Sequence, residues 1–425
     1  MMNSKCLTFI VWCVSLGFSC GVATAEELRT LQGRWIKIVT DLPSSPATDS
    51  LPQSVDAAVP QWIRFWKQPA SCVDGWQLTL YLIKDLPRFR QAGLIPRSLP
   101  DFPHGFQSGK EAWAIVQPSD YFTRHLVLHE SFHGFAEHVF GGTGPSWFAE
   151  GTAEMMATHT GSAGTIRVPI IPASREAAPY WGRFKIINQR RDEHVVPAIE
   201  TILGQRNALY AEVEPYVWSW SAAVLMTMYP EYRSALTAAS KRVADRSPGF
   251  ASAFRGDLES EWPALRTRWQ LLMEDFDYGY DIARNRADWK TPDLDWTGSV
   301  RTMKVAANRG WHSAGVKIPA GAEIQVKATG RYSLGNQPRP WICEPPGVTV
   351  RYHRGHPLGM VLAALVPIAD GENGVVRPLQ VEKVGSRASI VAKQDSWLYF
   401  RIGDDPSELA DNQGEATVQF VQPAP

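Results

Sequence analysis

The sequence predicts two parts, an α+β unit over residues 26–292 and an all-β unit over residues 297–425. Segments rich in Val, Ile, Thr and Tyr in the first 120 residues are typical of strands. From Tyr121 to about residue 284 the apolar side chains recur with helical spacing. After Trp296 the chain consists of short strand-like segments separated by turns, which favours a β-sandwich or jelly roll.

In the first unit we expect strands at residues 35–41, 76–82 and 112–117. The Pro- and Ser-rich residues 42–53, and residues 96–109, are expected to be loops. Helices are predicted at 121–139, ending at Gly141-Gly142, and from Pro145, which suits a first helical turn. Later helices are expected at 216–228, 231–244 and 261–284.

The second unit is predicted to contain about eight short strands. Its alternating segments are VKIPAGAEIQVKATGRYSL, VTVRYH, MVLAALV, ASIVAK, SWLYFRI and EATVQFV. We detect neither a fixed-period repeat nor a low-complexity tract.

The charge balance argues against a nucleic-acid partner. Lys plus Arg and Asp plus Glu each number 43, so the basic footprint that phosphate binding requires is missing. A peptide or a sugar remains compatible with this balance. The 17 Trp residues fit core packing, with sugar stacking as the rarer use.

The N-terminus predicts export. Residues 1–5 carry one positive charge, an apolar stretch follows to Val22, and Ala23-Thr24-Ala25 is a small-x-small cleavage site. We expect residues 1–25 to be a signal peptide that leaves a protein without a membrane span. Cys72 and Cys343 would then remain, either as one disulfide or as two unpaired thiols.

The segment LVLHESFHGFAEHVF contains His129-Glu130-Ser131-Phe132-His133. Residues four apart lie on one helix face, so the two imidazoles can bind one metal ion with Glu130 beside them. A catalytic zinc usually has a third protein ligand. Glu150 and Glu154, in WFAEGTAE, are again four apart and follow a tight turn, and Glu150 is our candidate.

These pieces resemble the gluzincin metallopeptidases, most closely the exported peptidase MA-like group, and the match is specific over residues 125–158. The resemblance implies a zincin-like (thermolysin-like) catalytic domain in which His129, His133 and Glu150 bind Zn²⁺. It also implies that Glu130 is the general base and that Glu154 orients a ligand histidine. The separation of His133 from Glu150 is slightly shorter than in aminopeptidases of this type.

A hydrolase of this kind needs a group that stabilises the developing oxyanion. Tyr216, in EPYVWSWSAAVL, is the candidate, followed by Tyr210 and His194. For each aromatic residue, core packing is the competing interpretation. His125, His138 and His159 are interpreted as structural or surface residues, with His159 suited to a helix C-terminus.

The loop GDDPSELADNQG is compatible with a solvated turn or with a Ca²⁺ site. Together with GWHSAG, ATGRYSLG and the His356-Pro357 turn, it resembles the LecA-like galactophilic lectin domain, a galactose-binding-like jelly roll. The resemblance implies Ca²⁺ ligands at Asp404, Asp411 and Asn412, with carbonyl ligands from Glu408 and Leu334, and a sugar contact from His356. A Gln expected shortly after the His-Pro turn is missing.

These features predict an exported zinc-dependent hydrolase, expected to be a metallopeptidase that acts on a peptide or protein substrate, including glycosylated ones. Its C-terminal module would bind carbohydrate and calcium. The alternative is a carbohydrate- or surface-binding protein on a degenerate peptidase scaffold. The presence of Glu130 favours the enzyme, because a scaffold that only bound metal would not require it.

Overall fold

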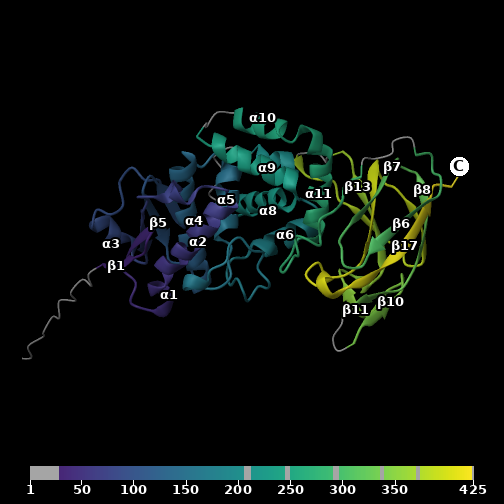
Figure 1. Ribbon diagram of the computed structural model, residues 1–425, viewed down its shortest axis with the longest axis horizontal. Helices are drawn as coiled ribbons and strands as arrows, with labels where there is room; N and C mark the ends of the chain where they lie inside the picture. The colour runs from purple at the N-terminus through teal and green to yellow at the C-terminus, as the bar shows by residue number, and fades with distance from the viewer. Residues whose placement is uncertain are drawn as a thin grey trace, which may run out of the picture.

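The computed structural model describes residues 28–204, 212–244, 249–290, 296–335, 339–369 and 374–423. The predicted signal peptide and Tyr210 lie outside these residues. A mainly helical part and a β-rich part lie side by side along the long axis of the molecule (Figure 1). The α+β and all-β regions expected from the sequence are therefore confirmed as regions.

A five-stranded sheet forms one side of the first part, in the order β1-β2-β3-β5-β4. Its strands are β1 (Arg29–Gln32), β2 (Ile36–Thr40), β3 (Leu78–Ile83), β4 (Gly105–Ser108) and β5 (Glu111–Ile115). The central pairs β2/β3 and β3/β5 are parallel, whereas β1 and β4 pair antiparallel at the two edges. β4 is therefore an edge strand.

The two faces of this sheet carry different side chains, as the period of two requires. Leu78, Leu80 and Leu82 join the main core of the first part, against Phe132 and Phe135. The alternate residues of β3, Tyr81 and Ile83, face the other side of the sheet. There they belong to a smaller apolar cluster with Phe89 and Trp113.

Eleven α-helices are described in this part. They are α1 (Pro46–Asp49), α2 (Leu51–Phe65), α3 (Leu86–Gln91), α4 (Asp120–Phe140), α5 (Ser146–Ala157), α6 (Arg183–Asp192), α7 (Ile199–Leu203), α8 (Glu214–Met228), α9 (Pro230–Ala239), α10 (Gly249–Gly256) and α11 (Trp262–Asp275). Helix α4 packs on β3, β4 and β5, and α5 packs between α4 and α8.

Several predicted boundaries are wrong. Residues 42–53 are not a loop throughout, because Ser45 caps α1 and α2 begins at Leu51. The predicted loop 96–109 contains β4, which pairs with β5. The helix predicted at 231–244 is α-helical only as far as Ala239. The helix predicted at 261–284 ends at Asp275. Polar composition hid the first two elements, and tertiary packing ended the last two.

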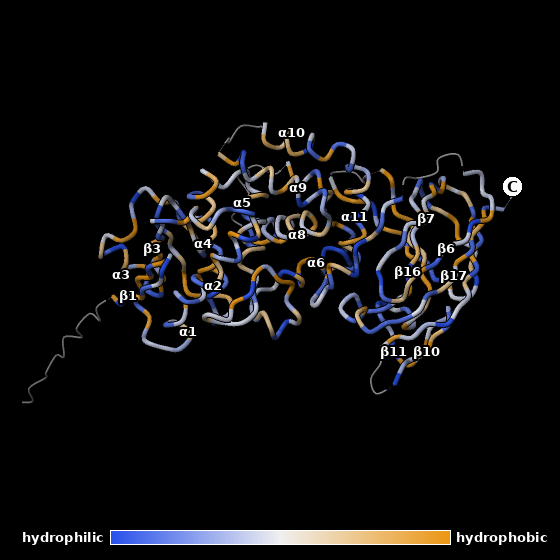
Figure 2. The backbone as a smooth tube through the Cα atoms, in the orientation of Figure 1, coloured by the Kyte–Doolittle hydropathy of each residue, from blue (hydrophilic) through white to orange (hydrophobic). Residues whose placement is uncertain are grey.

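The β-rich part contains two larger antiparallel sheets and a two-stranded ribbon. Its strands are β6 (Arg301–Ala306), β7 (His312–Ile318), β8 (Glu323–Thr329), β9 (Tyr332–Leu334), β10 (Trp341–Cys343), β11 (Val348–His353), β12 (His356–Leu358), β13 (Val361–Pro367), β14 (Gln380–Lys383), β15 (Arg387–Val391), β16 (Ser396–Ile402) and β17 (Gln413–Val421). One sheet follows the order β10-β9-β17-β8-β15, with β6 also on β17, and the other follows β14-β13-β16-β7. Orange and blue stretches alternate along several of these strands in Figure 2.

Strand β13 is buried on both faces, unlike the alternating β8. Val361, Ala363 and Leu365 belong to the core between the sheets. Leu362 and Ala364 belong instead to a separate cluster with residues of the helical part. β13 therefore contributes to two cores at once, and α11 packs against its outer face.

A buried ion pair reinforces this contact between the two parts. Arg401 Nη1 lies 2.5 Å from Asp275 Oδ2, and Trp311 Nε1 donates to the same oxygen at 2.8 Å. The side chains of Arg401 and Asp275 are 3% and 6% exposed. The end of α11 is thus joined to β16 by charge as well as by apolar packing.

The structure also describes the two remaining cysteines and the apolar character of the helices. Cys72 is half-buried and Cys343 is buried, and both are free thiols, which selects the second of the two alternatives. Across the described ranges, no helix has the length and apolar character needed to cross a membrane.

Candidate metal centre

Two helices carry the candidate site. Ser119 caps α4 by accepting a hydrogen bond from Phe122 N at 3.1 Å, which sets the register of the histidines that follow. α5 crosses α8 so closely that a Cβ on Gly151 would lie 2.3 Å from the carbonyl oxygen of Ser219. The glycine directly after Glu150 therefore allows α5 to lie where Glu150 faces α4.

The structure brings His129, His133 and Glu150 together. His129 Nε2 lies 3.1 Å from His133 Nε2 and 3.1 Å from Glu150 Oε2, and His133 Nε2 lies 3.4 Å from the same oxygen. His129 and His133 are buried, and Glu150 is partly exposed. This His-His-Glu group could hold a metal ion.

Glu130 lies beside this group, at the edge strand β4. It is 5% exposed, and a Cβ on Gly105 would lie 2.2 Å from its Oε1 atom. Any side chain at this point of the strand would therefore displace the carboxylate of Glu130. Burial raises the pKa of Glu130, which brings the carboxyl closer to the range of a general base.

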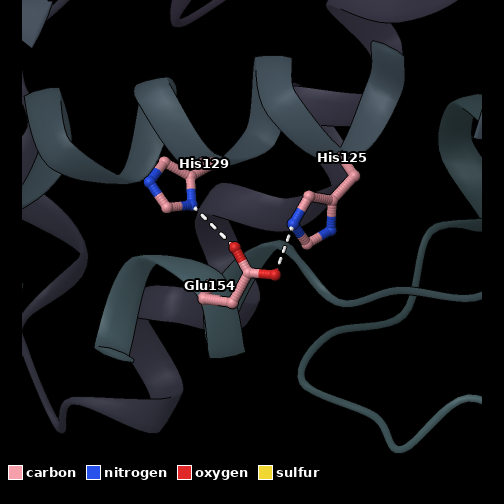
Figure 3. A group of neighbouring side chains, drawn as sticks. All are labelled: His125, His129 and Glu154. Atoms are coloured by element: carbon pink, nitrogen blue, oxygen red, sulfur yellow. Dashed lines mark ion pairs between the residues drawn. The ribbon is translucent and has the colours of Figure 1, made fainter. Parts of the chain in front are cut away.

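Glu154 lies on the other side of the His129 ring. Its Oε2 atom is 3.3 Å from His129 Nδ1, and its Oε1 atom is 3.2 Å from His125 Nε2 (Figure 3). Arg183 Nε and Trp181 Nε1 also donate to Oε1, at 2.8 and 2.9 Å. Glu154 is thus fixed by four groups, and His125, His129 and Glu154 form a second group that could hold a metal.

The charges of these side chains follow from their contacts. Although burial opposes ionisation, the charge of Arg183 holds the pKa of Glu154 well below its usual range. Burial likewise opposes the charged form of Glu150, but His133 and His129 lower its pKa to about 2. Burial disfavours the imidazolium of His129, yet Glu150 and Glu154 raise its pKa to about 10. Burial lowers the pKa of His125, which disfavours the charged form of this ring.

The other predicted residues are spread over the molecule. Tyr216 is half-buried on α8, and its ring centre lies 6.3 Å from that of His129. His194 lines a cavity next to the β-rich part instead. His138 is exposed and stacks on Trp76, and His159 is buried against Tyr121.

Sequence reasoning missed the partners that hold Glu154. His125 was interpreted as structural or surface, although its spacing of four from His129 offered a signal. Trp181 and Arg183 carry no such signal, because they lie almost 30 positions beyond Glu154. Gly105 was assigned to a loop, so its contact with Glu130 was also missed.

In the β-rich part, one cavity of about 390 Å³ collects the predicted calcium residues. Leu334, Asp404, Glu408, Asp411 and Asn412 all line it, together with Trp341 and Arg351. His356, the predicted sugar contact, does not line this cavity.

The contacts inside this cavity are specific. Asn412 Nδ2 donates to Asp404 Oδ2 at 2.7 Å, and Asn412 Oδ1 accepts from Gly335 N at 3.2 Å. Arg351 Nη1 lies 2.7 Å from Glu408 Oε2. Asn412 is thus hydrogen-bonded to Asp404, whereas Glu408 is paired with the guanidinium of Arg351.

Comparisons with known proteins give distant similarities to solved structures. No protein-family model matches the sequence. No curated protein matches it either. Among solved structures, the chain is similar to the EclA N-terminal domain, described as a PllA-like lectin, with 20% identity and a TM-score of 0.22. That similarity covers 29% of this chain and 95% of the other.

Proposed function

We propose that this protein is a zinc-dependent hydrolase whose metal is held by His129, His133 and Glu150. The observation that carries the proposal is the spacing of their three donor atoms, 3.1, 3.1 and 3.4 Å. Ligand atoms about 2.05 Å from a tetrahedral zinc lie about 3.3 Å apart. Two histidines and a glutamate are also a common donor set of catalytic zinc.

The second His-His-Glu group is a poorer metal site. Its carboxylate, Glu154, already accepts hydrogen bonds from Arg183 and Trp181. A cation placed there would lie next to the buried guanidinium of Arg183 and would be repelled by it. Glu154 is therefore proposed to orient His129, by accepting a hydrogen bond from Nδ1 and leaving Nε2 for the metal.

A zinc ion at this site would supply a water of lowered pKa and would polarise a substrate carbonyl. Glu130 is proposed to accept a proton from the attacking water and then to deliver it to the leaving amine nitrogen. Its raised pKa suits both steps, and its contact with Gly105 limits where the carboxylate can move. The hydroxyl of Tyr216 is proposed to donate to the oxyanion.

A peptide bond is the proposed substrate bond, on the strength of the sequence resemblance of residues 125–158 to gluzincin peptidases. Export through residues 1–25 is part of the proposal. If it is right, the secreted or periplasmic protein begins at Glu26, which N-terminal sequencing checks.

The C-terminal part is proposed to bind calcium and a carbohydrate at the 390 Å³ cavity. Residues with carboxylate and amide side chains line this cavity, and such oxygens are ligands that Ca²⁺ prefers. Trp341, 36% exposed, offers a ring on which a sugar can stack. A glycan array with and without chelator tests this, and equal binding in both conditions would remove calcium from the proposal.

Metal content and cleavage of a peptide library together test the enzyme. We expect about one zinc per chain in the wild type, and a large loss in His133→Ala. Glu130→Gln should keep zinc and lose cleavage. His138→Ala is the matched control, because His138 lies on the same helix, is exposed, and contacts Trp76 instead of the site.

The results separate the two candidate functions. Zinc-dependent cleavage that disappears in Glu130→Gln supports the hydrolase. A wild type that binds zinc and cleaves nothing in a broad library contradicts it. Together with glycan binding at the C-terminal cavity, that result would favour the binding protein on a degenerate scaffold.

A further inference from the structure

A cavity of about 500 Å³ lies where the helical and β-rich parts meet. Its wall is formed by residues from α6 and α11, by the turn between β11 and β12, and by residues 376–379. α6 and α11 lie next to the β-rich part in Figure 1. The cavity shares no residue with the group around His129.

Backbone hydrogen bonds fix two walls of this cavity to each other. Val376 N donates to Val196 O at 2.9 Å, and Ala198 N donates to Gly374 O at 2.7 Å. Residues from the β-rich part thus pair with the segment after α6, so the cavity is preformed. Preformed cavities of this size between two units are frequent ligand sites.

Among the described residues that line the cavity, guanidinium groups outnumber carboxylates. Arg191, Arg354 and Arg377 line it against the carboxylates of Asp192 and Glu274. Arg354 Nη1 lies 3.5 Å from Glu274 Oε1. Arg191 Nη1 donates to two neutral acceptors, the carbonyl oxygens of Met273 and Glu274, at 3.4 and 3.2 Å. Burial lowers the pKa of Arg191, and repulsion by the charge of Arg354 lowers it further. An anion would relieve this repulsion.

The side-chain amide of Gln270 carries a buried hydrogen-bond acceptor in the wall of this cavity. Its side chain is 4% exposed, and Nε2 donates to the carbonyl oxygen of Pro367 at 3.2 Å. Within the described ranges, no donor reaches its buried Oε1 atom. A buried acceptor left unsatisfied costs about 1–3 kcal/mol, so a hydroxyl or N–H of a ligand would be stabilised there.

The remaining wall is apolar. Met273, Val376 and Leu379 line the cavity beside the charged groups. A ligand that matches all three features has a carboxylate for arginine, a hydroxyl for Gln270, and a C–H face for the apolar wall. Among small molecules, sugars that carry a carboxylate combine these groups.

We propose that this cavity between the two parts binds an acidic sugar. The carboxylate pairs with Arg191 and Arg354, a ring hydroxyl donates to Gln270 Oε1, and the ring face packs on Met273 and Leu379. The site is separate from both the metal centre and the calcium residues, so its test does not depend on the proposed hydrolase.

Calorimetric titration of the full-length mature protein with sodium glucuronate tests the proposal. Glucose keeps the ring without the charge, and acetate keeps the charge without the ring, so each is expected to bind at least about tenfold more weakly. Methyl glucuronoside distinguishes the two sources of such a sugar. Binding equal to that of glucuronate fits a glycan end, and loss of binding fits the free sugar.

Two variants localise the site. Arg354→Gln, at an exposed turn, is expected to weaken glucuronate binding by about tenfold. Gln270→Met removes the acceptor at similar size and is expected to weaken it by about fivefold. Arg387→Gln is the control, because Arg387 is exposed on β15 and lines neither of the two cavities.

Three results would overturn the proposal. They are no binding of glucuronate at about 10 mM, equal binding of glucuronate and glucose, and unchanged affinity in Arg354→Gln. Because Arg354 is exposed, its variant remains informative even where Gln270→Met fails to fold.

Discussion

Zinc binding at His129 should release a proton. In the metal-free protein, Glu150 and Glu154 raise the pKa of His129 to about 10 against the effect of burial, so the ring is charged at neutral pH. Zinc takes the Nε2 position that this proton occupies, while Nδ1 keeps its proton towards Glu154. Removing the proton at about pH 7 costs about 4 kcal/mol, at 1.36 kcal/mol for each pH unit below the pKa.

The sign of the pH effect follows directly. Because the proton and zinc compete for the same nitrogen, the apparent zinc affinity rises with pH around neutrality, by about tenfold per unit. Glu150, with its pKa lowered to about 2, is already ionised and adds nothing to this slope.

Calorimetry measures the released proton. Zinc is titrated into metal-free protein at about pH 7 in two buffers that differ in ionisation enthalpy, and the difference in heat gives the number of protons. A chelator competition at about pH 6.5 and 7.5 then gives the slope of affinity. Heats independent of the buffer, with an affinity that does not change with pH, would refute a charged His129.

Three substitutions test other contacts. Glu154→Gln removes the charge that orients His129, and zinc affinity measured by chelator competition should fall about 10–100-fold. Gly105→Ala places a Cβ 2.2 Å from Glu130 Oε1 and should lower cleavage at least about tenfold with zinc content unchanged. Asp275→Asn leaves Arg401 buried without its partner and should lower the free energy of unfolding, measured in denaturant, by about 3–5 kcal/mol.

Each of these has a result that contradicts it. Zinc affinity within about twofold of the wild type would show that Glu154 does not orient the ligand. Gly164→Ala is the control for the strand variant, since nothing lies within 4 Å of a Cβ there. Equal cleavage by both glycine variants would remove the steric argument. A change below about 1 kcal/mol in Asp275→Asn would mean that the ion pair is weakly coupled to folding.

The candidate metal centre was predictable where its geometry is local. A spacing of four residues on a helix places His129 and His133 on one face, and the same spacing relates Glu150 to Glu154. A tight turn between the two helices was enough to expect that they face each other. Arg183 and Gly105 could not be found in this way, because tertiary packing alone brings them to the site.

Prediction of the fold from the sequence also succeeded only where the signal is local. Strands β2, β3 and β5 were expected from their Val, Ile, Thr and Tyr content. Strand β4, with its Gly and Ser, has no such signal and forms only because β5 offers an edge. MVLAALV was grouped with the alternating segments, although its unbroken apolar run is typical of a strand buried on both faces.

The double burial of β13 limits how this protein can be divided for experiments. Expressing the β-rich part alone would expose Leu362, Ala364 and Val366 along one strand, next to Trp311. An apolar stripe of this kind promotes self-association of the fragment. A soluble fragment for ligand studies would therefore need polar replacements on that face, or would need to keep α11 as its natural cover.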